Sequence, residues 1–417
     1  MANNPIDSKV KRFSNLVELD LAYFIGGGFW LSLSTFFSLI GGIFLSALFA
    51  RIWPKDAYGQ FSFLMSALGF MSLTALPGMG QALTQAVAEG KDGSYKIALR
   101  AVAKWSMLGV LLLTLGSVYF FFRQNPNLAL ATFVSALAFP ISSATGLSTS
   151  FLTGKKNFKK VAIFSIIFQY SSILATALAL CILPTLVWVA LFSAWSTAIA
   201  GIILTLLAYR DIKHDVIDPT TASLGTHLSF SQVFTISADY LDRFLIPLLL
   251  GFSNNAVYAF AILIPSQLHT FLKVFLSLGQ PKISNISEKR IFHGLWVKAL
   301  QLEIPIALMV AFYIIIAPII FKVLYPAYSE SATFLSQIFS LGLLYYPGNL
   351  FGLGLLKKRK IKSIYIVNIT YAVSTAASLL ILIPLFGLLG AVLAKLIARI
   401  VQYGVQLYLF YEQSKSD

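Results

Sequence analysis

The chain has 417 residues, of which 58% are hydrophobic and 11% are charged, whereas about a quarter of the residues in soluble globular domains are charged. With a mean hydropathy of +0.80, this composition excludes a soluble globular protein and predicts an all-α, multi-pass integral membrane protein. The formal net charge of +15 would suit a nucleic-acid partner as well as a membrane surface, and the positions of the basic residues decide between them. The single cysteine, Cys181, excludes a disulfide framework within one chain.

The first segment, residues 1–28, differs from the rest of the chain. Apolar and charged residues alternate at roughly helical period over residues 8–25, just before Gly26, Gly27 and Gly28. This pattern predicts an interfacial amphipathic helix joined by a glycine hinge to the first span. No small-residue cleavage site follows the first apolar run, so we expect that run to be a retained span.

Apolar runs of the length needed to cross about 30 Å of hydrocarbon recur along the rest of the chain. The predicted spans are residues 29–50, 60–84, 104–122, 128–152, 161–183, 186–208, 228–250, 256–278, 299–321, 331–355, 363–384 and 387–410. Twelve spans place both termini on the same side of the membrane.

The basic residues fix the predicted orientation. Most of the 31 Lys and Arg residues fall in the connections that lie on the side of the N-terminus, while the external segments hold Arg51, Lys55, Arg123 and Lys322. This asymmetry predicts cytoplasmic termini. It also explains the net charge by attraction to anionic inner-leaflet lipid, so we expect no nucleic-acid partner.

Landmarks repeat at an offset of about 200 residues, which predicts two related halves. DAYGQF at 56–61 resembles NAVYAF at 255–260, and Pro184 and Pro384 close equivalent spans. The alternative is that basic loops and closing prolines simply recur in membrane proteins. If the repeat is real, two six-helix lobes are related by a parallel pseudo-two-fold axis, with a central cavity between them. The expected domains are the N-terminal segment, 1–28; the N-lobe, 29–208; a cytoplasmic linker, 209–226; the C-lobe, 227–411; and a tail, 412–417.

The seventh span carries three charges, Asp239, Asp242 and Arg243. A charge at mid-membrane costs at least about 2.5 to 3.5 kcal/mol, so it requires a partner or a hydrated cavity. Asp239 and Arg243 are spaced i, i+4 and are able to form a neutral pair that joins helices. The remaining carboxylate is then a candidate carrier of an ion or a proton.

Three other spans hold isolated polar groups. His269 and Lys273 follow Pro265 on the eighth span, where Lys273 either faces a cavity or extends to the cytoplasmic headgroups. Lys395 and Arg399 form a stripe on the twelfth span that either lines a polar path or packs against acids on a neighbouring helix, and we favour packing. At the outer end of the first span, an arginine such as Arg51 usually anchors the helix at the interface.

The external loops are too short to carry a folded catalytic segment. The four histidines lack ligand spacing, and no nucleotide-binding or serine-hydrolase motif occurs in a suitable setting. We therefore expect no enzyme activity, no metal site and no cofactor.

Several stretches together resemble a known family. ALFARIWPKDAYGQFSF (47–63) and PGMGQALTQAVAEG (77–90) resemble the first two helices of polysaccharide repeat-unit flippases of the Wzx type, within the MOP superfamily that also contains the MATE exporters and the lipid II flippases. FLTGKKNFKKVAIFS (151–165) is similar to the fourth-to-fifth helix junction, and DYLDRFLIPLLLGFSNNAVYAFA (239–261) to the seventh-to-eighth helix signature.

The resemblance implies a V-shaped pair of lobes whose first, second, seventh and eighth helices line the cavity. The candidate cavity residues are Arg51, Asp239, Asp242, Arg243, His269 and Lys273. Asp239 and Asp242 are the candidates for coupling to H⁺ or Na⁺. Lys395 and Arg399 lie on a helix that is not expected to line the cavity, which favours packing.

The implied activity is translocation of undecaprenyl-pyrophosphate-linked O-antigen or capsule repeat units across the bacterial inner membrane, from the cytoplasmic to the periplasmic leaflet. Cationic groups in the cavity would offset the pyrophosphate charge. Expected partners are this lipid, membrane lipid, and polysaccharide polymerase and chain-length proteins. The alternatives are a cation-coupled multidrug exporter of the same superfamily and an integral-membrane glycan polymerase or ligase. The sugar composition and the oligomeric state do not follow from the sequence.

Overall fold

The computed structural model describes residues 21–284, 288–352 and 361–415, and every regular element in these ranges is a helix. The helices of the first half are α2 (Leu21–Ile52), α3 (Lys55–Met71), η1 (Ser72–Ala75), α4 (Met79–Ala88), α5 (Ser94–Phe122), α6 (Pro126–Thr145), α7 (Leu147–Gly154), α8 (Phe158–Ile182) and α9 (Leu186–Tyr209). Those of the second half are α10 (Thr221–Leu250), α11 (Phe252–Ser284), α12 (Glu288–Leu324), η2 (Pro326–Tyr328), α13 (Ser329–Ser340), η3 (Leu341–Gly348) and α15 (Ile361–Lys415).

Local sequence signals set several helix starts. The Asn125 side chain accepts a hydrogen bond from the Leu128 amide at 3.1 Å, with Pro126 at the first helical position of α6. Asn157 caps α8 in the same way, accepting from the Lys160 amide at 3.2 Å. Each cap satisfies one amide that has no partner inside the helix.

One predicted span is bent, and a second break separates two predicted spans. The second span consists of α3, η1 and α4, bent by 50°, where Leu76 adopts a left-handed conformation (φ 53°) before Pro77. Gly387, with φ 58° and ψ −132°, interrupts α15 after Pro384. This break falls between the predicted eleventh and twelfth spans, because Pro cannot donate the helical hydrogen bond and glycine tolerates positive φ.

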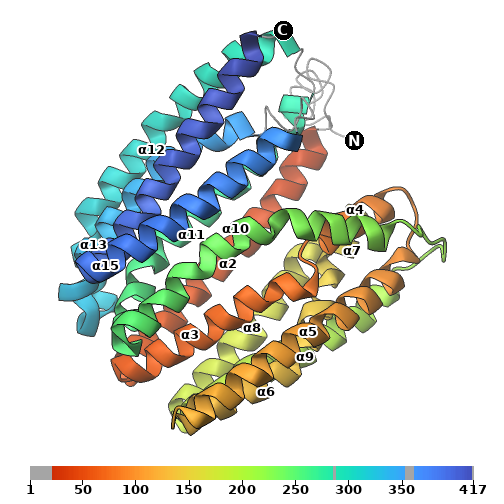
Figure 1. Cartoon of the computed structure of the whole chain (residues 1–417). Helices are drawn as coiled ribbons and strands as arrows, with labels where there is room; N and C mark the ends of the chain where they lie inside the picture. Colours follow the sequence, from red (N-terminus) through yellow and green to blue (C-terminus); the bar gives the residue numbers. More distant parts are fainter. Residues whose placement is uncertain (1–20, 285–287, 353–360, 416–417) are drawn as a thin grey trace, which may run out of the picture.

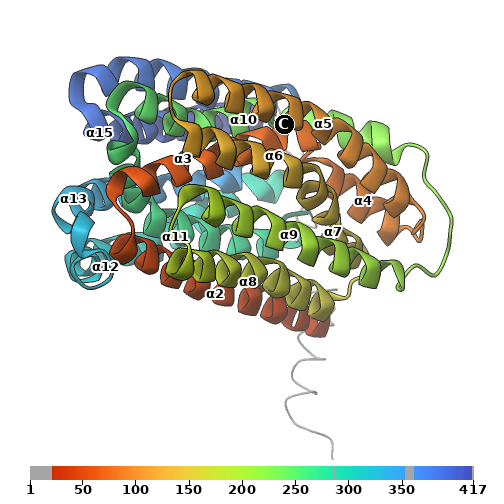
Figure 2. The same ribbon diagram turned by 90° about the horizontal axis from the view of Figure 1, so that it is seen from below.

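The helices form two lobes (Figures 1 and 2). In the N-lobe, α2 packs along α8, and in the C-lobe α10 packs along α15. The first helix of each half therefore pairs with a later helix of the same half, as two related halves would predict. The seam between the lobes is formed by α3 against α11 and α10, and by α4 against α10.

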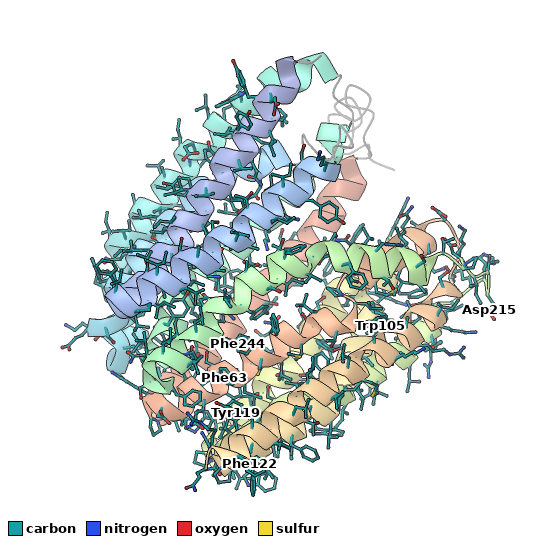
Figure 3. The ribbon with its side chains drawn as sticks, viewed as in Figure 1. Phe63, Trp105, Tyr119, Phe122, Asp215 and Phe244 are labelled. Carbon is teal, nitrogen blue, oxygen red and sulfur yellow. The ribbon has the colours of Figure 1, made fainter. Side chains whose placement is uncertain are left out.

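The two ends of the molecule are packed differently. We call the end with connections 52–55, 122–126 and 250–252 the outer end, and the end with connections 88–94, 154–158 and 209–221 the basic end. Figure 3 shows Asp215 at the basic end of the N-lobe and Phe122 at its outer end. One hydrophobic core at the outer end contains residues of both lobes, including Phe49, Tyr58 and Phe260. Toward the basic end, the N-lobe and the C-lobe have separate cores. The lobes are therefore joined at the outer end.

Within the described residues, seven helices are long and apolar enough to cross a membrane, or eight if the bent α3–α4 pair is one span. The long α15 counts once although it covers two predicted spans. Neither α10 nor α11 is among the seven, because both are more polar than their neighbours. The chain is a multi-pass membrane protein, and its two most polar long helices lie at the seam.

The described residues cover only part of the predicted N-terminal amphipathic helix and its glycine hinge. Most of the predicted amphipathic helix, residues 8–25, lies outside the described residues. Helix α2 continues without a break through Gly26, Gly27 and Gly28, so the predicted hinge is helical in this conformation, because glycine tolerates the helical conformation as well as a turn. Between the lobes, only residues 210–220 of the predicted linker are non-helical, since α10 begins at Thr221.

Candidate substrate and coupling site between the lobes

Asp242 and Lys395 form a buried ion pair inside the C-lobe. Lys395 Nζ lies 3.2 Å from Asp242 Oδ1, and the two side chains are 6% and 3% exposed. The same ammonium group donates hydrogen bonds to the carbonyl oxygens of Ala238 (2.8 Å) and Asp239 (3.3 Å). The hydroxyl of Tyr258 donates to Asp242 Oδ2. Protein groups therefore oppose both charges, as a low-dielectric interior requires.

The second carboxylate of α10 has a different partner. The Tyr371 hydroxyl donates to Asp239 Oδ1 at 2.9 Å, and Asp239 is exposed while Tyr371 is buried. The Asp239–Arg243 pair that the i, i+4 spacing allowed is not formed in the described structure. Both acids of α10 instead interact with α15 or α11, inside the C-lobe.

Arg243 lines a pocket of about 180 Å³ between the lobes. Tyr58 and Ser62 of α3 form its N-lobe wall, and Tyr258 and Ser266 of α11 form its C-lobe wall. The guanidinium carbon lies 5.3 Å from the Tyr240 ring centroid. No carboxylate lies within ion-pair distance of Arg243 among the described residues, and its buried Nε has no hydrogen-bond partner there. Among the described residues, Arg243 is thus a cation at the seam without an anionic partner.

The other predicted cavity residues are spread over the length of the molecule. Arg51 is at the outer end, where its Nη2 donates to the Val323 carbonyl of α12 at 3.3 Å. On α11, the His269 ring contacts the Tyr346 ring at 5.1 Å between centroids, and Lys273 is exposed further toward the basic end. The structure therefore does not bring Arg51 and Lys273 together with Arg243.

Lys395 and Arg399, the predicted stripe of the twelfth span, lie inside the C-lobe. Lys395 is buried against α10, and the side chain of half-buried Arg399 lies beside Gly342. Packing, rather than a polar path, describes Lys395 in this conformation.

The outer ends of the two lobes meet backbone to backbone. A Cβ added at Gly59 of α3 would lie 1.8 Å from the Phe252 carbonyl oxygen. Asn255 donates through Nδ2 to the Gly59 carbonyl at 2.9 Å, and Tyr58 stacks on Phe260 with ring centroids 4.5 Å apart. This close contact separates the Arg243 pocket from the outer end.

At the basic end, the connection between the lobes is attached to the N-lobe. Buried Asp92 accepts hydrogen bonds from Lys155 Nζ and from the backbone amides of Lys213 (2.9 Å) and His214 (3.4 Å). Burial alone would raise the pKa of the Asp92 carboxyl, but these three donors outweigh it and hold the pKa below its usual value. Lys96 and Lys160 form ion pairs with Asp215 and Asp211 of the connection.

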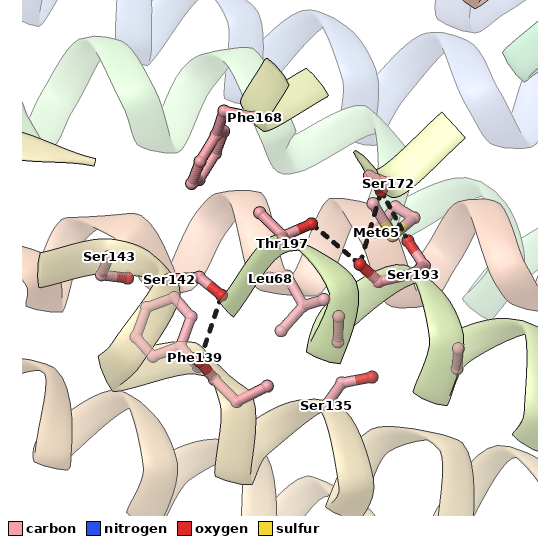
Figure 4. A pocket seen from close by; sticks show the side chains of 13 residues that line it. Met65, Leu68, Ser135, Phe139, Ser142, Ser143, Phe168, Ser172, Ser193 and Thr197 are labelled. Atoms are coloured by element: carbon pink, nitrogen blue, oxygen red, sulfur yellow. Dashed lines mark hydrogen bonds between the residues drawn. The ribbon is translucent and has the colours of Figure 1, made fainter. Parts of the chain in front are cut away.

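A second cavity, of about 270 Å³, lies within the N-lobe, between α3, α6, α8 and α9 (Figure 4). Its hydroxyl groups are engaged locally: Ser142 donates to the Ala138 carbonyl, Thr197 donates to the Ser193 carbonyl, and Ser172 contacts Ser193. These side chains satisfy one another and the helix backbones, which is typical of helix packing in lipid.

Sequence reasoning missed the tyrosines that bind the two acids, Tyr258 and Tyr371. In the sequence, Tyr258 stands out only within the repeated motif NAVYAF, where it corresponds to Tyr58 of DAYGQF. The available signal was that each mid-span charge needs a partner, but many polar residues of the C-lobe spans satisfy that condition.

A family model of polysaccharide biosynthesis proteins matches residues 24–278. Among solved structures, an inward-facing multidrug resistance MATE family transporter of the MOP superfamily shares 12% identity, with 92% of this chain and 95% of that chain covered and a TM-score of 0.69. The lipid II flippase MurJ in an inward closed conformation shares 17% identity, with 91% and 86% covered and a TM-score of 0.64. An outward-facing MATE transporter shares 14% identity, with 94% and 96% covered and a TM-score of 0.62. No curated protein matches the sequence. These similarities establish the two-lobe fold of MOP transporters and flippases.

Proposed function

The chain belongs to the polysaccharide biosynthesis protein family, and from this premise we propose that it is a flippase for lipid-linked oligosaccharides. Its substrate would be an undecaprenyl-pyrophosphate-linked repeat unit of O-antigen or capsule. The protein would move the unit from the cytoplasmic to the periplasmic leaflet of the bacterial inner membrane by alternating access.

The observation that carries the proposal is the contrast between Arg243 and the two acids. Arg243 faces the pocket between the lobes without a protein anion, whereas Asp242 is neutralised by Lys395 and Asp239 is bound by Tyr371. Arg243 is the charged side chain among the described residues that line this pocket, so a ligand at the seam meets a cation. A guanidinium binds phosphate oxygens through two parallel hydrogen bonds, so this site suits a pyrophosphate.

The packing of the lobes supports transport that begins at the basic end. The shared core closes the outer end, while the lobes have separate cores toward the basic end. A lipid tail can remain in the bilayer while the head group occupies the space between the lobes. Rocking of one lobe against the other would then expose the head group to the outer side.

The buried pair offers a route for coupling to a proton gradient. The Lys395 ammonium is already surrounded by Asp242 Oδ1 and by two carbonyl oxygens. These oxygens are the kind of ligands that a sodium ion would need, so coupling to H⁺ fits the C-lobe better than coupling to Na⁺. Protonation of Asp242 would break the ion pair and loosen α10 from α15.

Substitution of Arg243 tests the proposal. In a strain that lacks the gene, we expect the wild-type chain to restore surface polysaccharide, Arg243→Lys to restore part of it, and Arg243→Ala to restore none. Arg100→Ala, which removes an exposed arginine of α5, is the matched control and should behave as wild type. Membrane levels of each variant are measured by immunoblotting.

Three results would contradict the proposal. Full surface polysaccharide with Arg243→Ala would show that this cation does not bind the substrate. Periplasmic single repeat units in the deletion strain would point to loss of a polymerase or ligase, because a flippase defect leaves the lipid-linked unit facing the cytoplasm. Unchanged polysaccharide with lost drug resistance would favour a multidrug exporter. Polymerase and chain-length proteins are the expected partners downstream.

A further inference from the structure

The largest cavity described here lies in the basic-end half of the N-lobe, away from Arg243. It measures about 680 Å³ and is lined by α4, α7 and α8, together with Pro77 just before α4. This volume is within the usual range for small-molecule binding sites, about 300 to 1,000 Å³. Arg243, Asp242 and Lys395 are not among the residues that line this cavity.

The cavity wall is polar and uncharged. Its described lining residues include the amides of Gln81 and Gln85 and the hydroxyls of Thr149 and Ser165, and none of them is charged. Gln81 and Gln85 are exposed, and their i, i+4 spacing places both amides on one face of α4. The side-chain amide of Gln81 has no hydrogen-bond partner among the described residues, so it can both donate and accept.

The hydroxyl groups complement the amides. Thr84 donates to the Gly80 and Ser150 carbonyls at 2.8 and 3.0 Å, and Thr153 donates to the Thr149 carbonyl at 2.7 Å. Because each hydroxyl donates to the backbone, its oxygen remains free to accept. The wall therefore presents neutral donors and acceptors, which match the hydroxyls of a sugar and offer nothing to offset a phosphate charge.

Local sequence builds this wall. The bend at Leu76 and Pro77 turns α4 away from the axis of α3. A Cβ at Gly80 would lie 2.7 Å from Ser150 Oγ, and one at Gly154 would lie 2.9 Å from the Thr84 carbonyl. The two glycines thus allow α4 and α7 to approach closely, which places their polar side chains side by side.

The distance between the cavity and Arg243 can be measured along helix α10. The Gly78 amide, next to Pro77, donates to Ser229 Oγ at 3.0 Å. Arg243 lies fourteen residues further along the same helix, which corresponds to about 21 Å at the helical rise per residue. A single sugar attached to a pyrophosphate at Arg243 would not reach the cavity, whereas a longer oligosaccharide would.

We propose that this cavity, which we call the N-lobe polar pocket, binds the distal, uncharged sugars of the lipid-linked oligosaccharide while Arg243 binds the pyrophosphate. The inference rests on the proposed function and adds to it a second subsite that selects for the length of the sugar chain. A site built from hydrogen-bonding groups discriminates strongly against ligands that leave those groups unpaired.

The test compares two lipids in proteoliposomes that contain the full chain. One is the lipid-linked repeat unit that accumulates in the deletion strain, and the other is a polyprenyl-pyrophosphoryl monosaccharide. Transport is followed as the rate at which the sugars become inaccessible to periodate, a membrane-impermeant oxidant added outside. The test variant is Gln81→Leu with Gln85→Leu, which changes two exposed side chains. The control is Gln60→Leu, which removes an amide of α3 at the outer end of the same bent span.

We expect the double variant to move the full repeat unit about fivefold to tenfold more slowly, the loss of roughly one net hydrogen bond or slightly more, and to move the monosaccharide at the wild-type rate. Arg243→Ala should slow both lipids. Wild-type rates for both lipids in the double variant would overturn the pocket assignment, and so would an equal slowing of both. If the wild-type chain moves neither lipid, the proposed function itself fails.

Discussion

Replacement of Gly59 by alanine should open the outer end of the molecule. A Cβ at this position would lie 1.8 Å from the Phe252 carbonyl oxygen, whereas ordinary contacts begin at 3.4 Å. Because the obstacle is backbone, α3 and α11 would have to separate by about 1.6 Å. Such a separation also breaks the 2.9 Å hydrogen bond from Asn255 to the Gly59 carbonyl.

The energetic effect follows from these two contacts. Overpacking of this kind costs about 1 to 3 kcal/mol, and the lost hydrogen bond adds about 1 kcal/mol. A conformation with the outer ends apart avoids both costs. The equilibrium should therefore shift toward it by about 2 to 4 kcal/mol, which is roughly 30-fold to several hundredfold.

Thiol labelling from outside measures this shift. In a Cys181→Ser background, Ser62→Cys places the only thiol in the Arg243 pocket, inside the outer contact. A membrane-impermeant maleimide added to spheroplasts should label it much faster in Gly59→Ala than in the parent. Gly116→Ala is the control, since a Cβ there meets nothing within 4 Å. An unchanged labelling rate in Gly59→Ala, with the protein folded and inserted, would refute this reasoning.

Three further predictions concern the buried polar groups. Asp242→Asn and Lys395→Met should each lower the free energy of unfolding by about 3 to 5 kcal/mol, because each leaves an unpaired charge; the double variant should recover most of it, and additive losses in thermal unfolding would contradict the ion pair. Tyr258→Phe leaves Asp242 Oδ2 without its donor and should cost about 1 to 3 kcal/mol, while Tyr408→Phe, at a 64% exposed position, should cost nothing measurable. Asp92→Asn should lower the unfolding temperature at pH 7. Because the pKa of Asp92 is lowered in the folded chain, the contribution of this carboxylate to stability is complete above the unfolded pKa of about 3.9 and disappears as the pH falls through the folded pKa. A difference in unfolding temperature between wild type and Asp92→Asn that does not change with pH would argue against this role.

The fold was largely predictable from the sequence. Apolar length predicted the helices, because the bilayer imposes that length, and the landmarks that repeat at an offset of about 200 residues predicted the two halves. The break at Leu76 was not predicted, although Pro77 marks its position. The family resemblance named the first, second, seventh and eighth helices, and the second, seventh and eighth (α3 with α4, α10 and α11) form the seam.

The site was less predictable, because pairing across helices depends on rotation and depth that periodicity does not fix. Helical spacing allowed a pair between Asp239 and Arg243, yet α10 directs Asp242 toward Lys395, which is 153 positions away in the chain. Hydrogen bonding by Tyr258 and Tyr371 left no mark in the sequence, since tyrosine is common near membrane interfaces. The N-lobe polar pocket depends on the bend before α4 and was missed for the same reason.

Helix α10 contacts the N-lobe near its start and the C-lobe farther along. Near its start, Gly225 and Ser229 lie against Met79 and Gly78 of the N-lobe, and farther along it is fixed to α15 by Lys395. Farther along, Tyr240 and Phe244 of α10 also lie against α3 of the N-lobe, so a rotation of the lobes would have to bend this helix or shift its contacts with α3. Asp92 fixes the connection before α10 to the N-lobe, so this connection does not act as a flexible link between the lobes. Chain cleavage within residues 211–218 should therefore leave the lobes assembled. A rigid crosslink along residues 230–237 of α10 should stop transport.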